Sequence, residues 1–260
     1  MNTRHLWLAV VMICMAAPAC AERILIAAED DWAPYSAMRS DSPEPEGFTP
    51  SLVREIFARR DIAVEFVTVP FSRCLHYAQT GRTVACFNVT ITDDNRDQFY
   101  WHPTPMFHEG LAIFALRGRF KPELSSKDLE QYKVGITNAY TYPTDFMQNP
   151  RIDRSVAQSD ANLLKMLIKG RVDFIIMNTL PGQLRILDEK LGGKIERVGM
   201  ISLDGFWLSF SKAHPDGERL SQLFEEELNR LIVSGRVAEL ELNMKTRLGF
   251  LLPQDAQVGQ

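Results

Sequence analysis

The same unit of helix, glycine, arginine and strand occurs twice in this chain. The first copy lies around Gly81-Arg82 and the second around Gly170-Arg171, and each is followed by an apolar strand, 84–89 and 172–176. A glycine at a helix end favours the left-handed turn that leads the chain into its next element. Alternating helices and buried strands are typical of α/β folds. The recurrence therefore predicts two α/β lobes of similar build, as a structural repeat and not a functional motif.

Several helices are predicted from caps and apolar spacing. Thr49 is expected to cap a helix with Pro50 at its first position, and Asp160 to cap a helix over 161–169. A long amphipathic helix is expected from Pro215 to Gly235. The acidic triplet 225–227 inside it is interpreted as a solvated face.

A change of composition places the boundary between the lobes. The apolar strand 110–116 is followed by a polar stretch, 117–127, and a new strand starts at Lys133. Separate strands are predicted over 195–203 and 206–210. We therefore expect one boundary near residue 117 and the return near residue 203.

The first 21 residues have the pattern of an export signal. Arg4 and His5 form a basic head, residues 6–17 are apolar, and Ala19-Cys20-Ala21 fits the small-x-small cleavage pattern. The apolar run is shorter than the roughly 20 residues that span a bilayer. We expect cleavage before Glu22 and release into the periplasm, which is favoured over lipidation at Cys20.

Charge and composition exclude some classes of partner. Loss of the signal removes Arg4 and changes the formal net charge from −4 to −5. Nucleic acids and anionic membranes attract clustered Lys and Arg, which this chain lacks. No metal-ligand spacing, Walker loop or Gly-x-Ser-x-Gly elbow is present. We expect a small solute as partner, with no nucleic acid and no cofactor.

Two cysteines, Cys74 and Cys86, remain after removal of the signal. In an oxidising compartment a pair this close in sequence can form a disulfide. Two buried thiols are the alternative, and the sequence leaves both open.

Five segments, in this order, resemble the family 3 periplasmic solute-binding proteins that supply amino-acid ABC importers. The opening strand and aromatic-Ala-Pro-aromatic loop correspond to residues 24–35, and the other segments are Gly47-Phe48 with Leu52-Val53, Asn88-Val89-Thr90-Ile91-Thr92 with Arg96, Lys169-Gly170-Arg171-Val172-Asp173, and the closing residues 210–215 with 231–235.

The resemblance implies a bilobed α/β fold of the type II periplasmic-binding-protein class, with two hinge strands. Lobe 1 would comprise residues 22–116 and 204–250, lobe 2 residues 117–203, and a C-terminal tail residues 251–260. A ligand would lie between the lobes of a monomer that delivers it to an ABC permease in the inner membrane.

The resemblance also suggests a ligand site. Arg96 would bind a carboxylate in bidentate fashion, although one extra residue separates it from Thr92. Asn178 stands where the family commonly has an Asp for the ligand's ammonium, and Glu29 is placed to compensate. The other candidates are aromatic walls and polar groups at strand ends: Trp32, Tyr35, Phe71, Asn88, Thr90, Thr92, Asn138, Tyr140 and Thr141.

Two other functions compete with solute capture for transport. Relatives of this fold include a cyclohexadienyl dehydratase, and Glu29 or Asp173 would be the acid or base of such an enzyme. A ligand-sensing partner of a membrane receptor is the other. Because the sequence offers no triad, metal set or cofactor loop, it favours a receptor without catalytic activity.

Overall fold

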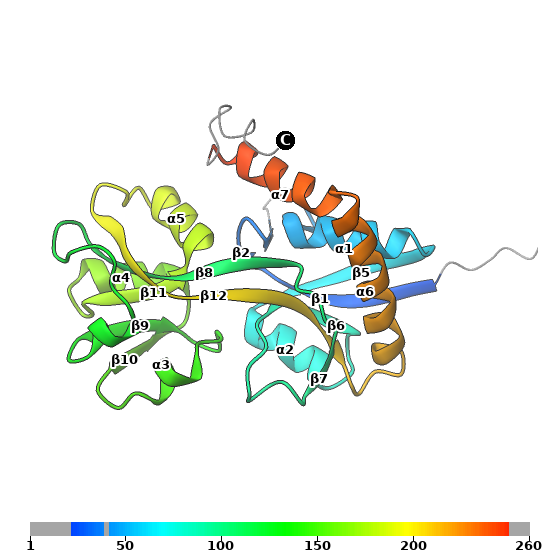
Figure 1. Cartoon of the computed structure of the whole chain (residues 1–260), viewed down its shortest axis with the longest axis horizontal. Helices are drawn as coiled ribbons and strands as arrows, with labels where there is room; N and C mark the ends of the chain where they lie inside the picture. Colours follow the sequence, from blue (N-terminus) through cyan, green and yellow to red (C-terminus); the bar gives the residue numbers. More distant parts are fainter. Residues whose placement is uncertain (1–21, 39–41, 250–260) are drawn as a thin grey trace, which may run out of the picture.

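Two lobes share one long mixed sheet in the computed structural model, which describes residues 22–38 and 42–249 (Figure 1). The sheet has nine strands in the order β10-β9-β11-β8-β12-β6-β1-β5, with β7 beside β12. The expected cleavage site and the tail at 251–260 lie outside the described residues.

Lobe 1 carries β1 (Glu22–Glu29), β5 (Ile62–Val69) and β6 (Ala85–Val89), which are parallel, and β7 (Phe99–Trp101). A three-stranded sheet of β2 (Asp31–Trp32), β3 (Ser36–Met38) and β4 (Pro45–Glu46) follows β1. The helices of lobe 1 are α1 (Phe48–Ala58), α2 (Phe71–Gln79), α6 (Gly217–Val233) and α7 (Arg236–Arg247). Apolar faces of α1 and α6 pack on one face of the sheet and α2 on the other.

Lobe 2 carries the parallel strands β9 (Lys133–Thr137), β10 (Asp153–Ala157) and β11 (Phe174–Asn178). Its helices are η1 (Ser126–Leu129), α3 (Thr144–Gln148), α4 (Asp160–Ile168) and α5 (Thr179–Asp188). Buried side chains of α4 and α5 lie on one face of the sheet, whereas η1 and α3 cover the other.

Both lobes contribute to the strands β8 (Phe107–Leu116) and β12 (Ile195–Ser211), which run antiparallel across the molecule (Figure 1). Their pairing extends from Ile195 opposite Leu116 to Phe206 opposite Phe107. Beyond it, β12 pairs with β6 and β7. The two strands predicted over 195–203 and 206–210 are thus one strand, and the exact lobe boundaries stay a prediction.

The two predicted helix caps are wrong by one residue or more. Gly47 precedes α1 with φ 133°, and a Cβ there would lie 2.5 Å from the carbonyl oxygen of Tyr35. Thr49 is buried inside α1 and its hydroxyl donates to Asn88 instead. Ser159, not Asp160, caps α4, because its side chain accepts the N–H of Asn162. Several residues able to cap are close neighbours at each helix start, so sequence alone does not assign the cap.

The acidic triplet of α6 is not a solvated face. Glu227 is only 2% exposed and accepts from Arg60 Nε at 2.5 Å, and it also pairs with Arg230. Glu225 accepts the backbone N–H of Thr104 at 3.0 Å. Glu226 accepts from Arg60 Nη2 at 2.7 Å. All three carboxylates therefore attach α6 to the rest of lobe 1.

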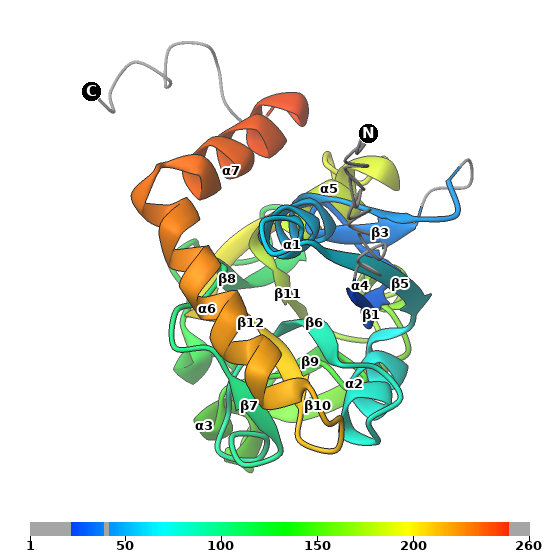
Figure 2. The same ribbon diagram turned by 90° about the vertical axis from the view of Figure 1, so that its right-hand side faces the viewer.

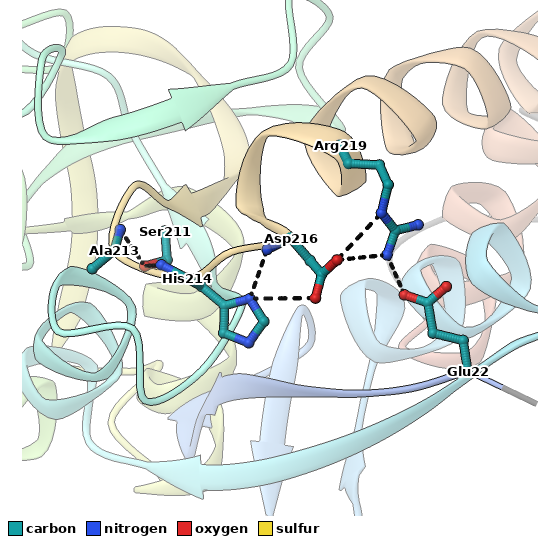
Figure 3. A network of polar contacts seen from close by, with 6 residues as sticks. All are labelled: Glu22, Ser211, Ala213, His214, Asp216 and Arg219. Carbon is teal, nitrogen blue, oxygen red and sulfur yellow. Dashed lines mark hydrogen bonds and ion pairs between the residues drawn. The ribbon is translucent and has the colours of Figure 1, made fainter.

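A polar network ties the start of β1 to the start of α6 (Figure 3). Arg219 pairs with Glu22 on β1 and with Asp216 beside its own helix. Ser211 at the end of β12 accepts the N–H of Ala213 and of His214 through its hydroxyl.

Helix α6 crosses lobe 1, and helix α7 continues from the end of α6 (Figure 2). Helix α7 was not predicted from the sequence. Among the described helices, none has the length and apolar character needed to cross a membrane.

The structure joins Cys74 on α2 to Cys86 on β6 through a disulfide. The bridge fixes α2 to the sheet beside Phe71 and Asn88, which both face the space between the lobes. A loop of this length contributes about 3 kcal/mol in the chain-entropy account.

We expect the Cys74→Ala/Cys86→Ala variant to lose about 2–4 kcal/mol of unfolding free energy, because its unfolded chain is no longer cross-linked. Urea unfolding measures the loss, and a reductant should lower the stability of the parent but not of the variant. Two thiols open to alkylation in the denatured, unreduced parent would show that the bridge does not form.

Candidate functional site

A pocket lies between the lobes, where strands of both end. This inner pocket encloses about 450 Å³, a volume that includes its opening to solvent. Its lining is aromatic, apolar and polar: Glu29, Trp32, Phe71, Asn88 and Thr90 from lobe 1, Leu111 and Asp204 with Phe206 from β8 and β12, and Tyr140, Thr141, Tyr142, Ile176, Met177 and Asn178 from lobe 2.

A second hollow, the outer pocket, adjoins the inner pocket and encloses about 550 Å³ including open space. Both are lined by Thr90, Thr141, Tyr142 and Asp204. Arg96 adds a cation to the outer pocket, and its side chain is 61% exposed and lies 3.8 Å from the carboxylate of Asp93. The two neighbouring pockets therefore offer an exposed guanidinium in the outer pocket and buried polar groups in the inner pocket.

The parallel strands explain why polar groups gather here. Glu29 ends β1, and Asn88 lies next to the end of β6. Asn178 ends β11, and its side chain makes no capping bond to α5. Ligands of α/β proteins bind at the carboxyl ends of such strands. The crossing of β8 and β12 turns the carboxyl edges of both lobes toward one pocket.

Glu29 is a buried carboxylate at the inner end of this pocket, with 4% of its surface exposed. Its Oε1 accepts a hydrogen bond from the Tyr140 hydroxyl at 3.1 Å. Burial, followed by the charges of Asp160, Asp30 and Asp31, raises the pKa of Glu29 well above its ordinary value. Within the described part of the chain, Glu29 forms no ion pair.

Asn88, which lines the same pocket, carries an unsatisfied buried donor. Its backbone is left-handed, with φ 55°, and its side chain is 3% exposed. Its Oδ1 accepts from the Thr49 hydroxyl at 2.7 Å, whereas its buried Nδ2 has no hydrogen-bond partner among the described residues. A buried donor without a partner costs about 1–3 kcal/mol. Asn88 therefore keeps an unused donor beside this pocket, within the described part of the chain.

Contacts across the pocket hold the lobes together. Tyr140 of lobe 2 reaches Glu29 and meets the ring of Phe71 edge-on, with centroids 5.8 Å apart. Arg185 on α5 forms an ion pair with Asp31 of lobe 1. The structure is therefore a closed arrangement of the two lobes.

The family model for bacterial extracellular solute-binding proteins, family 3, matches residues 24–243. The chain belongs to this family. No curated protein matches it. The resemblance that the sequence suggested, and the bilobed α/β fold expected from it, are confirmed.

Solved structures with the same fold include both transport and sensor proteins. A histidine kinase sensor domain similar to periplasmic binding proteins has 21% identity and a TM-score of 0.75, covering 86% of this chain and 96% of its own. A mutant of ArgBP from T. maritima has 17% identity and a TM-score of 0.73, covering 86% and 95%. An amino acid ABC transporter substrate-binding protein from Streptococcus pneumoniae, bound to L-arginine, has 18% identity and a TM-score of 0.72, covering 85% and 94%. At these identities the likeness shows the fold alone.

Most residues predicted for the site of this family 3 protein line one of the two pockets. Thr92 and Arg96 line the outer pocket, and the inner pocket includes Glu29, Trp32, Phe71, Asn88, Thr90, Tyr140, Thr141 and Asn178. Whether they bind a ligand stays a prediction. Asp204 lines both pockets and was not predicted. It directly follows the lobe boundary expected near residue 203, and a polar residue at that boundary was the sequence feature that could have indicated it.

Three predicted residues lie outside both pockets. Tyr35 is 1% exposed, stacks on Phe107 with centroids 4.2 Å apart, and donates its hydroxyl to Glu109. Asn138 is exposed on the loop after β9. Asp173, suggested as a catalytic acid or base, pairs with Arg119 at 2.7 Å.

The described residues contain no group of three or more His, Cys, Asp or Glu able to hold a metal ion.

Asp160 is a second buried carboxylate close to the site. It lies at the first position of α4 and accepts from the Thr137 hydroxyl at 2.6 Å. Burial raises the pKa of Asp160 to about 6, against the hydrogen bond from Thr137 and the charge of Arg185, which lower it. The folded protein therefore keeps this proton to a higher pH than the unfolded chain does.

We expect the unfolding free energy of Asp160→Asn, relative to that of the parent, to increase as pH rises from 4 to 7. The parent binds more protons folded than unfolded between the unfolded pKa of about 4 and the folded pKa, so it loses stability across that range, by up to about 3 kcal/mol. The substituted amide cannot ionise and still accepts from Thr137. Unfolding free energies of both proteins at several pH values provide the comparison; a difference that is constant with pH would contradict the assignment.

Proposed function

We propose that this protein captures a small polar solute, an amino acid or related carboxylate, between its lobes in the periplasm and presents it to an ABC permease. The observation that carries the proposal is the buried Nδ2 of Asn88, which among the described residues has no hydrogen-bond partner and belongs to a residue of the pocket that both lobes line. A carboxylate oxygen in the inner pocket supplies the acceptor that this donor lacks.

Arg96 supports a carboxylate at the outer pocket, where Asp93 and Asp204 are the acidic residues of the same lining. Arg96 gives the outer pocket an exposed guanidinium, which attracts an anionic group toward the opening. Asn178 gives lobe 2 an uncharged amide, which can donate to an acceptor as well as accept. The aromatic faces of Trp32 and Phe71 suit the carbon body of a solute.

The family and its structural neighbours support the role in uptake. Family 3 comprises extracellular solute-binding proteins, and one neighbour is an amino acid ABC transporter substrate-binding protein. Export to the periplasm, the permease and the monomeric state rest on the signal pattern and on this likeness.

A sensing role is the second candidate, favoured by the histidine kinase sensor domain among the neighbours. Both roles use the same closed pocket, so capture of the solute does not distinguish them. Permease and ATPase genes beside this gene support uptake, whereas a sensor gene supports signalling.

We further propose that the solute leaves the pocket chemically unchanged. The carboxylates of the inner pocket, Glu29 and Asp204, accept from Tyr140 and Ser202, and its other polar side chains are amides and hydroxyls, which are poor acids and bases at neutral pH. Recovery of an altered solute after incubation would instead support an enzyme like the dehydratases of this fold.

We expect Asn88→Asp to weaken binding of the cognate carboxylate at least about tenfold, because an oxygen replaces the donor while Oδ1 still accepts from Thr49. A thermal-shift screen of amino acids, polyamines and small carboxylates identifies the solute, and calorimetry measures both affinities. Asn162→Asp, which adds the same charge on α4 away from both pockets, is the control. Equal binding by Asn88→Asp and the parent would mean that this amide does not face the solute.

A further inference from the structure

Tyr140 occupies the inner end of the pocket although it belongs to lobe 2. It follows β9, and its hydroxyl lies 3.1 Å from Glu29 Oε1 on β1. Its ring packs against apolar clusters of both lobes, including Phe71. The side chain therefore fills the space directly in front of a buried carboxylate.

We propose that Tyr140 is the specificity-determining residue of the inner pocket and limits it to short carboxylates by excluding solutes with a long cationic arm. This inference rests on the proposed function, since it concerns which solutes the same pocket accepts.

Without Tyr140, Glu29 has the surroundings of a cation site. It is a buried carboxylate without an ion pair in the described chain, and Asp160, Asp30 and Asp31 add negative charge around it. The charge of Arg185 is engaged by Asp31 across the lobes. Trp32 and Phe71 line the same pocket and offer faces to an ammonium or guanidinium. The neutral hydroxyl of Tyr140 now takes the place that such a cation would fill.

Displacement of Tyr140 by a solute is unfavourable. It would break the hydrogen bond to Glu29 and separate the ring from apolar side chains of both lobes. Loss of the Tyr140 hydroxyl would also leave the buried carboxylate of Glu29 without a hydrogen bond unless the cation of the solute reached it at once. The side chain therefore stays. The Thr90 hydroxyl is used by the Gly205 carbonyl, and Asp204 in the same lining accepts from Ser202. The groups left for a solute are Asn88 Nδ2, Thr141 and Asn178, which suit acceptor atoms.

Calorimetry with L-arginine as the probe tests this assignment on the parent, Tyr140→Ser and Tyr140→Ser/Glu29→Gln. We expect Tyr140→Ser to bind arginine at least about tenfold more tightly than the parent, and the double variant to lose that gain because the carboxylate is gone. Tyr132→Ser removes a tyrosine of lobe 2 outside both pockets and should leave arginine binding as in the parent.

The proposal is overturned if the arginine affinity of the parent is within threefold of that of Tyr140→Ser, or if neither protein binds arginine. It is also overturned if Tyr140→Ser/Glu29→Gln binds arginine as tightly as Tyr140→Ser does. Thermal melting checks that each variant is folded. Should Tyr140→Ser be unfolded, Tyr140→Leu keeps apolar packing and shortens the side chain, and the same gain is required of it. If the variants behave as expected but the parent binds no short carboxylate, the proposed function fails while the exclusion by Tyr140 stands.

Discussion

The antiparallel pairing of β8 with β12 is the constraint on which the rest of the structure depends. Each strand contributes to both lobes, so the backbone hydrogen bonds between them hold the two halves of the long sheet in one register (Figure 1). Because β6 joins β12 just beyond the crossing, the carboxyl edge of lobe 1 faces that of lobe 2. The pocket exists because the parallel strands of both lobes are joined to these two strands in one sheet.

Buried carboxylates reinforce the crossing from within. Glu109 on β8 accepts from the Tyr35 hydroxyl of lobe 1 and from the N–H of Leu180 at the start of α5 in lobe 2, at 3.1 Å. Burial raises the pKa of Glu109, and these hydrogen bonds oppose that shift. A buried carboxyl is tolerated when its lone pairs are occupied. Glu109 thereby joins both lobes to the hinge strand, and Glu29 with Tyr140 does the same at the pocket.

Local patterns predicted the elements and the general position of the site. Alternating helices and strands, glycine turns and the polar ends of β1, β6 and β11 are visible within a few residues of one another. Partners distant in sequence were not predictable in this way. Tyr35 resembled a pocket wall because its partner Glu109 is 74 residues away, and Glu227 resembled a solvated residue because Arg60 is 167 residues away.

A crystal structure of the mature protein with the carboxylate found by the thermal-shift screen tests the central claim most directly. The account predicts density in the inner pocket, with an acceptor atom within about 3 Å of Asn88 Nδ2, contacts to lobe 2 as well, and Tyr140 still bonded to Glu29. A solute bound to one lobe only, or outside the pocket, would contradict it.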